Sequence, residues 1–84
     1  MLCSVVGTRR IDMQTDRGDR LTGYSVFLEH DESGVQGVMA EKSFVSDSWI
    51  SGHLGGWVPS VGDFCVCSFN RRGKLIVDAP ADKR

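Results

Sequence analysis

Leu-Thr-Gly-Tyr-Ser-Val-Phe-Leu-Glu-His, residues 21–30, is the stretch that decides the fold. Tyr24, Val26 and Leu28 alternate with smaller, polar or aromatic residues, and a period of two is typical of a β-strand with two different faces. The polar segment 15–20 precedes it and carries a glycine, which favours a hairpin turn. A strand bounded by turns is therefore the first predicted element.

Similar segments lie on both sides of this one. Further strands are predicted at residues 2–13, 35–46, 63–69 and 74–78, separated by glycine-bearing turns at 31–34 and 70–73. Gly7 interrupts the first strand, and an isolated glycine in a strand indicates a bulge or bend of the kind that closes a small barrel. Three glycines in the connection 47–60 limit it to an irregular loop or a single helical turn.

These elements predict an all-β fold, a small five-stranded barrel of the oligonucleotide-binding (OB) type or a sandwich. The OB barrel is favoured because it places its helix or substitute loop between the third and fourth strands. We expect residues 1–80 to form one OB-like β-barrel domain and residues 81–84 to be a polar C-terminal tail. In the third strand neither set of alternating side chains is purely apolar, so its inward face stays undecided.

Composition excludes some classes of protein. The 84 residues suffice for one domain with a thin core, to which self-association would add buried area. The formal net charge is −1, so attraction to a polyanion depends on how the basic residues are distributed. The apolar N-terminal stretch is too short for a signal peptide, and none approaches the about 20 residues that cross a bilayer. We expect no membrane association.

The three cysteines are Cys3, Cys65 and Cys67, an odd number that does not suggest a disulfide framework. A reducing cytoplasm is the simpler interpretation. Cys-x-Cys with one distant cysteine does not match the usual zinc spacing, so core packing is favoured over a metal site. We expect neither a metal nor another cofactor.

Catalytic residues are hard to assemble from this chain. The only histidines are His30 and His53, and no metalloprotease, nucleophile-elbow or phosphate-loop motif is present. His30 has the acidic neighbours Glu29, Asp31 and Glu32, which favour a solvated acidic turn over a catalytic site. The prediction is a protein that is not an enzyme.

Basic residues gather in two turns that are distant in the sequence. Arg17 and Arg20 lie in the first, Arg71 and Arg72 lie in the last, and Lys74 follows. An OB barrel can bring these turns to one groove, where cations track phosphates and an aromatic ring such as Tyr24 stacks on bases. These six residues predict a site for single-stranded DNA or RNA. The plainer alternative is that charged hairpin tips only keep the strand ends solvated.

A second hypothesis assigns no nucleic-acid role. The connection 47–60 carries a dense apolar set for a glycine-rich segment, namely Trp49, Ile50, Leu54 and Trp57. Tryptophan often anchors protein interfaces. The chain would then be an OB-like or SH3-like protein-interaction module that binds its partner through this loop.

The segment 67–78, Cys-Ser-Phe-Asn-Arg-Arg-Gly-Lys-Leu-Ile-Val-Asp, resembles the closing hairpin of the gene V-type single-stranded DNA-binding proteins of filamentous phages. The charged hairpin 14–20 followed by Gly23, Tyr24 and Ser25 is similar in layout. The resemblance implies an OB-like barrel that dimerises and coats single-stranded DNA without strong sequence preference, with roles for Arg17, Arg20 and Tyr24. The chain also resembles small proteins of phages and bacterial mobile elements, which implies a setting of that kind.

Overall fold

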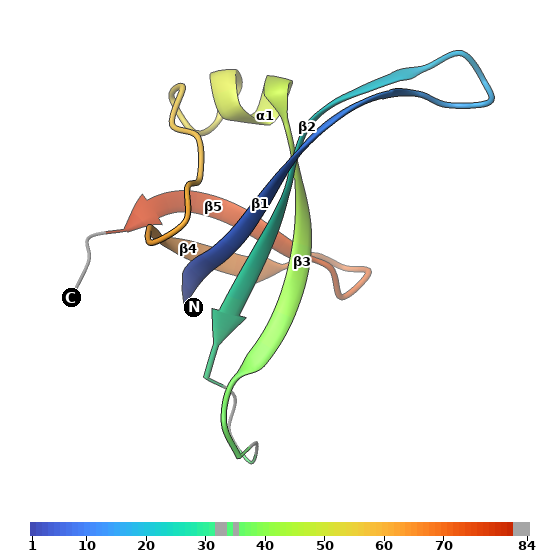
Figure 1. Cartoon of the computed structure of the whole chain (residues 1–84). Helices are drawn as coiled ribbons and strands as arrows, with labels where there is room; N and C mark the ends of the chain where they lie inside the picture. Colours follow the sequence, from blue (N-terminus) through green and yellow to red (C-terminus); the bar gives the residue numbers. More distant parts are fainter. Residues whose placement is uncertain (32–33, 35, 82–84) are drawn as a thin grey trace.

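Five antiparallel strands form one strongly curled sheet in the computed structural model, which describes residues 1–31, 34 and 36–81. The strands are β1 (Leu2–Gln14), β2 (Arg20–His30), β3 (Met39–Ser46), β4 (Phe64–Phe69) and β5 (Leu75–Ala81). They lie in the order β3-β2-β1-β4-β5, and the one short helix of the described residues, α1 (Asp47–Gly52), connects β3 to β4 (Figure 1). The predicted all-β class is confirmed, and so is the helical turn between the third and fourth strands.

The two end strands of the sheet, β3 and β5, approach each other without forming a backbone ladder within the described residues. Two side chains donate hydrogen bonds to β5 instead, one from β3 and one from α1, the helix that follows β3. The Ser43 hydroxyl donates a hydrogen bond to the carbonyl oxygen of Leu75 at 2.7 Å, and the Trp49 indole N–H donates to that of Val77 at 2.8 Å. We call this line of contact the β3–β5 seam. Full closure into a barrel, as the sequence predicts, is not shown.

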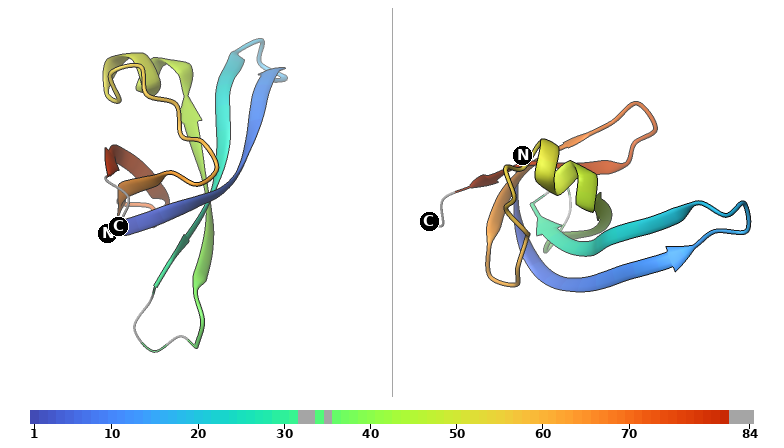
Figure 2. Two further views of the ribbon diagram at one scale, coloured as in Figure 1. Left: turned by 60° about the vertical axis from the view of Figure 1, so that its left-hand side comes forward. Right: turned by 90° about the horizontal axis from the view of Figure 1, so that it is seen from above.

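The core lies inside the curl and is covered at one end by α1 (Figure 2). Its members are the side chains that alternate inward along all five strands, together with Ile50 of α1 and Leu54. Cys3, Cys65 and Cys67 are each at most 1% exposed, which confirms the expected packing of the cysteines in the core. Ser46 begins α1 as its N-cap, because its hydroxyl accepts a hydrogen bond from the Trp49 N–H at 3.1 Å.

A bulge between Val5 and Gly7 changes the alternation of β1. Before the bulge, the odd-numbered residues Cys3 and Val5 point into the core. After it, the even-numbered residues of β1 lie on the inner side, as the pairing of Arg10 with the inward-facing Tyr24 shows. The far halves of β1 and β2 then continue as a two-stranded ribbon that projects from the body (Figure 1). The bulge that Gly7 predicted therefore also decides which side chains of β1 face outward.

Two strand boundaries differ from the prediction by more than one residue. β3 begins at Met39 rather than at residue 35, and Gly37, with a φ of 97°, has a backbone conformation that a strand does not accommodate. β5 continues to Ala81 because Ala79, Pro80 and Ala81 still pair with β4. Residues 32, 33 and 35, in the predicted turn and third strand, and residues 82–84 of the predicted tail lie outside the described residues.

Candidate nucleic-acid interface

The outer face of β1, β2 and β3 carries aromatic and basic side chains next to each other. Across the sheet, Phe27 pairs with Gly7 of β1 and with Lys42 of β3, while Ser25 pairs with Arg9 and with Phe44. Arg9 and Lys42 are exposed, and Phe27 and Phe44 remain 39% and 44% exposed. Residues on one face of neighbouring strands are close enough to act together. We call Arg9, Phe27, Lys42 and Phe44 the outer-face site.

Each of the two phenylalanines lies over a glycine of a neighbouring strand. A Cβ atom built on Gly7 would lie 3.4 Å from the Phe27 ring, and one built on Gly23 would lie 3.0 Å from Cζ of Phe44. The rings therefore occupy the space above the glycines, against the sheet, and each keeps an open side toward solvent. Flat, exposed rings fixed in this way are suited to stacking on planar groups.

A groove beside the outer-face site runs along the β3–β5 seam. Lys42 and Phe44 of β3 line it on one side, and Lys74 lines it next to the turn before β5. Glu41 also lines this groove and is half-buried, with its carboxylate 3.7 Å from Nε2 of the buried His30. The seam thus extends the outer-face site toward the β4–β5 turn and adds a third cation to it.

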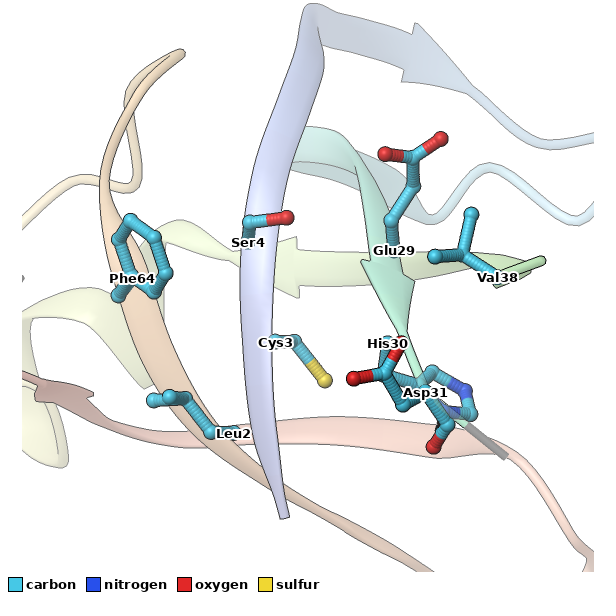
Figure 3. A pocket seen from close by; sticks show the side chains of 8 residues that line it. All are labelled: Leu2, Cys3, Ser4, Glu29, His30, Asp31, Val38 and Phe64. Carbon is cyan, nitrogen blue, oxygen red and sulfur yellow. Dashed lines mark hydrogen bonds between the residues drawn. The ribbon is translucent and has the colours of Figure 1, made fainter. Parts of the chain in front are cut away.

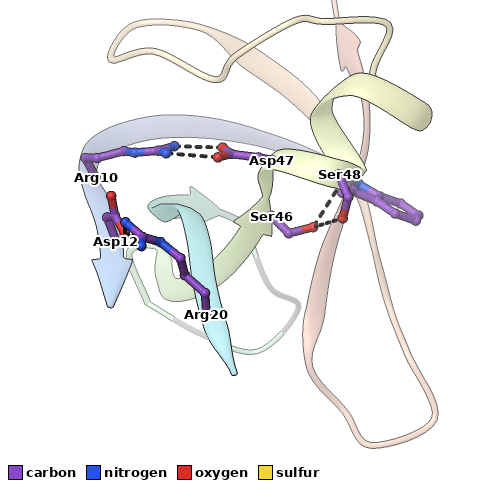
Figure 4. A network of polar contacts seen from close by, with 7 residues as sticks. Arg10, Asp12, Arg20, Ser46, Asp47 and Ser48 are labelled. Atoms are coloured by element: carbon purple, nitrogen blue, oxygen red, sulfur yellow. Dashed lines mark hydrogen bonds and ion pairs between the residues drawn. The ribbon is translucent and has the colours of Figure 1, made fainter. Parts of the chain in front are cut away.

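The arginine-bearing turns project from the same side of the molecule, although the β1–β2 turn lies at the end of its long ribbon and the two tips are not side by side (Figures 1 and 2). Arg17 is exposed at the first tip. Arg20 is ion-paired with Asp12 at 2.8 Å across the ribbon (Figure 4), so part of its charge is offset.

The β4–β5 turn presents its cations without such pairing in the described residues. Arg71 and Arg72 are exposed, and the turn is held by Asn70, whose side-chain oxygen accepts hydrogen bonds from the N–H groups of Arg72 and Lys74 at 2.9 and 3.0 Å. A turn with a fixed backbone displays its side chains in a reproducible place. Of the six predicted site residues, Lys74 is the one that the structure brings next to the outer-face site.

Tyr24 does not offer an open ring. Its side chain lies on the inner side of the sheet, is half-buried and packs against the core. The Arg10 guanidinium carbon lies 5.0 Å from the centre of the Tyr24 ring, and Arg10 is held there by two hydrogen bonds to Asp47 at 2.7 and 2.9 Å (Figure 4). These hydrogen bonds place the pKa of Asp47 below its usual range. The expectation that Tyr24 is an exposed stacking surface is corrected by this packing.

The apolar side chains of the 47–60 connection are turned into the molecule. Ile50 and Leu54 are 7% and 6% exposed, and Trp49 and Trp57 are half-buried against the core. Trp49 also stacks on His53, with ring centres 3.9 Å apart. This packing removes the exposed apolar surface on which the protein-interaction hypothesis depends.

His30 lines a separate pocket of about 180 Å³ with Cys3, Ser4 and Glu29 (Figure 3). His30 is 4% exposed, so it is not solvated as its acidic neighbours suggested, whereas Asp31 next to it is exposed. Burial raises the pKa of the Cys3 thiol, which makes it a poor nucleophile. No group of side chains suited to a metal ion occurs among the residues that the structure describes.

The sequence analysis selected Tyr24 as the stacking ring and did not select Arg9, Phe27, Lys42 or Phe44 for the site. The available signal was the outward parity of Phe27 on the clearest strand, opposite to that of Val26 and Leu28.

Comparison of the chain with known protein families, curated proteins and solved structures finds no match. Over the described part of the chain, no helix has the length and apolar character needed to cross a bilayer.

Proposed function

We propose that this chain binds single-stranded nucleic acid, DNA in the first instance, without strong sequence preference. The observation that carries the proposal is the pair Phe27 and Phe44, each exposed and laid over a glycine, with Arg9 and Lys42 next to them on the same face. Proteins that hold single strands combine aromatic faces, which stack on bases, with cations that follow the phosphates.

The local charge supports this function although the net charge is −1. Arg9, Lys42 and Lys74 take part in none of the ion pairs found among the described residues, and Arg71 and Arg72 extend the same cationic side. Glu29, on the outer side of β2 beyond Phe27, limits the site at that end. With a few cations in contact, affinity falls steeply as salt rises.

The same rings favour an unpaired strand over a duplex. Stacking on Phe27 or Phe44 needs a base with a free face, and duplex bases are already stacked on one another. A single-stranded oligonucleotide therefore gains both stacking and phosphate contacts, whereas a duplex gains the phosphate contacts alone. The homodimer and the phage-like setting that the sequence resemblance implies stay predictions, and light scattering of the purified chain tests the first.

The test is a fluorescence-anisotropy titration of a labelled mixed-sequence 20-nucleotide strand at low salt. The Phe27→Leu/Phe44→Leu variant removes both rings and keeps apolar side chains. Since stacking contributes about 1–3 kcal/mol per base, it should weaken binding more than tenfold. Phe69→Leu is the matched control, because Phe69 is 45% exposed but lies on β4.

The control should bind like the unaltered chain, and circular dichroism should show that all variants are folded. Binding of the double variant at the original affinity, or no binding of the unaltered chain at high micromolar concentration, rejects the proposal.

A further inference from the structure

Two neighbouring pockets of different chemistry lie along the β3–β5 seam, and we call them together the trough and each pocket one of its ends. One end, about 350 Å³, is lined by Lys42 and Lys74; the other, about 290 Å³, is lined by Trp49 and Val77. Phe44 and Ile76 line both ends, so the two pockets are adjacent. The first end carries two lysines and one half-buried glutamate, Glu41, whose carboxylate lies near His30, and the second end is mostly apolar.

A nucleotide has the same two parts, an anionic phosphate and a flat, largely apolar base. We propose that the apolar end of the trough takes one base out of the stacked strand, between Phe44 and Ile76 and next to Trp49, while Lys42 and Lys74 contact the phosphate beside it. This inference rests on the proposed function and adds a base pocket to it. The strand would pass from Phe27 to Phe44 and then turn into the seam.

An open sheet edge can also pair with an added β-strand, but the seam is less suited to that occupant. A strand that pairs with β5 needs the carbonyl oxygens along its edge. Those of Leu75 and Val77 already accept hydrogen bonds from Ser43 and Trp49 across the seam. Ser43 also connects β3 directly to β5, and Trp49 connects α1, which follows β3, to β5, where an inserted strand would have to lie.

Phe44 links the pocket to the outer-face site. Its ring is fixed over Gly23, and it forms part of both the stacking face and the wall of the trough. A base stacked on the open side of Phe44 and a base in the trough would therefore be neighbours in one strand.

The test uses Trp49 as a reporter. The chain has two tryptophans, so Trp57→Phe leaves Trp49 as the only one. In this background, a thymidine pentanucleotide should change the Trp49 emission at the same concentrations at which anisotropy reports binding. An abasic sugar-phosphate strand of equal length should bind more weakly and leave the emission unchanged.

Ile76→Phe in the same background fills the apolar end of the trough. It should remove most of the emission change and weaken binding of the pentanucleotide about five- to tenfold, while the outer-face site still holds the strand. Val61→Phe, a change of similar size at a residue 66% exposed in the loop before β4, is the control and should do neither.

Two results overturn the base pocket while leaving the proposed function intact: saturating binding by anisotropy with no change in Trp49 emission, or an unaltered emission change in Ile76→Phe. A loss of self-association in Ile76→Phe, measured by light scattering, would assign the trough to a second copy of the chain and also overturn it. Absence of any binding by anisotropy overturns the proposed function and the pocket together.

Discussion

The ring of Phe44 lies over Gly23 of the neighbouring strand, and this relationship depends on the missing side chain. A Cβ at Gly23 would lie 3.0 Å from the ring and would collide with the carbonyl oxygen of Val45. Gly23 is itself buried although it lies on the outer side of the sheet, because the β3 backbone at Val45 and Ser46 and the Phe44 ring cover it. One glycine thus gives an exposed aromatic residue a fixed position.

Gly23→Ala should therefore destabilise the fold. We expect a loss of roughly 1–3 kcal/mol in the free energy of unfolding, measured with urea, because the new methyl group must push Phe44 and the β3 backbone away. Gly7→Ala is the matched control, since its Cβ would meet the Phe27 ring at an ordinary contact distance of 3.4 Å. Equal stability of the two variants would contradict this account of the outer face.

Ser43→Ala tests the bridge across the β3–β5 seam. The buried hydroxyl donates to the Leu75 carbonyl oxygen at 2.7 Å, and its removal leaves that oxygen without this partner. The expected loss is about 1–3 kcal/mol in the free energy of unfolding. Ser68→Ala, at an exposed position on β4, should change stability by much less. If both variants unfold at the same urea concentration, the bridge does not stabilise the seam.

Lys42→Ala should reduce the salt dependence of strand binding. Each phosphate contact of a single strand contributes about −0.7 to the slope of log K against log salt. Anisotropy titrations at several salt concentrations should show a slope smaller in magnitude by about that amount. Arg20→Ala is the comparison, because Arg20 is paired with Asp12 on the ribbon and should alter the slope less. An unchanged slope in Lys42→Ala would remove Lys42 from the site.

Because the three cysteines are buried, we expect the free energy of unfolding to fall at alkaline pH. The hydrogen bond with Cys65, together with burial, raises the pKa of the Cys67 thiol, and burial raises that of Cys3. Below the unfolded pKa of about 8.5 both thiols are protonated in either state, and their contribution is complete. Above it the unfolded chain releases these protons first, so the free energy of unfolding falls as pH rises.

Urea unfolding between neutral pH and about pH 10 measures this effect, and Cys3→Ala should show a shallower decline. In the opposite direction, the Cys67 hydrogen bond lowers the pKa of Cys65, which offsets part of the decline. The folded chain should also resist alkylation by iodoacetamide until it is unfolded. Rapid alkylation of all three thiols at neutral pH in the folded state would show that the core is more open than described.

The alternation in residues 21–30 was sufficient to predict β2 and to place Val26 and Leu28 on the same side of it. In β3 the alternation did not reveal the inward face, because one set of side chains includes Lys42 and Phe44 and the other includes Ser43. Ser43 faces inward because its hydroxyl reaches a carbonyl oxygen on β5, a partner 32 residues away. A local pattern cannot reveal such a contact.

The candidate site, too, was predicted only where local sequence decides the structure. Gly7 predicted a bulge, but the resulting change of parity, which sends Arg10 inward to Tyr24 and Asp47, depends on the register with β2. Tyr24 was selected as the stacking ring although it alternates in step with Val26 and Leu28, and Phe44 was not selected. The Phe44 ring lies over Gly23, a diagonal neighbour on β2 whose direct partner is Ser46, and this pairing is known only from the fold.

Mapping of the contact surface by amide chemical shifts tests the central claim most directly. Isotope-labelled chain is titrated with an oligothymidylate, and the account predicts that the largest shifts occur around Gly7, Arg9, Phe27, Lys42 and Phe44. Shifts confined to the opposite outer surface, around Leu2, Val66 and Ala79, or no shifts at saturating strand, would contradict it.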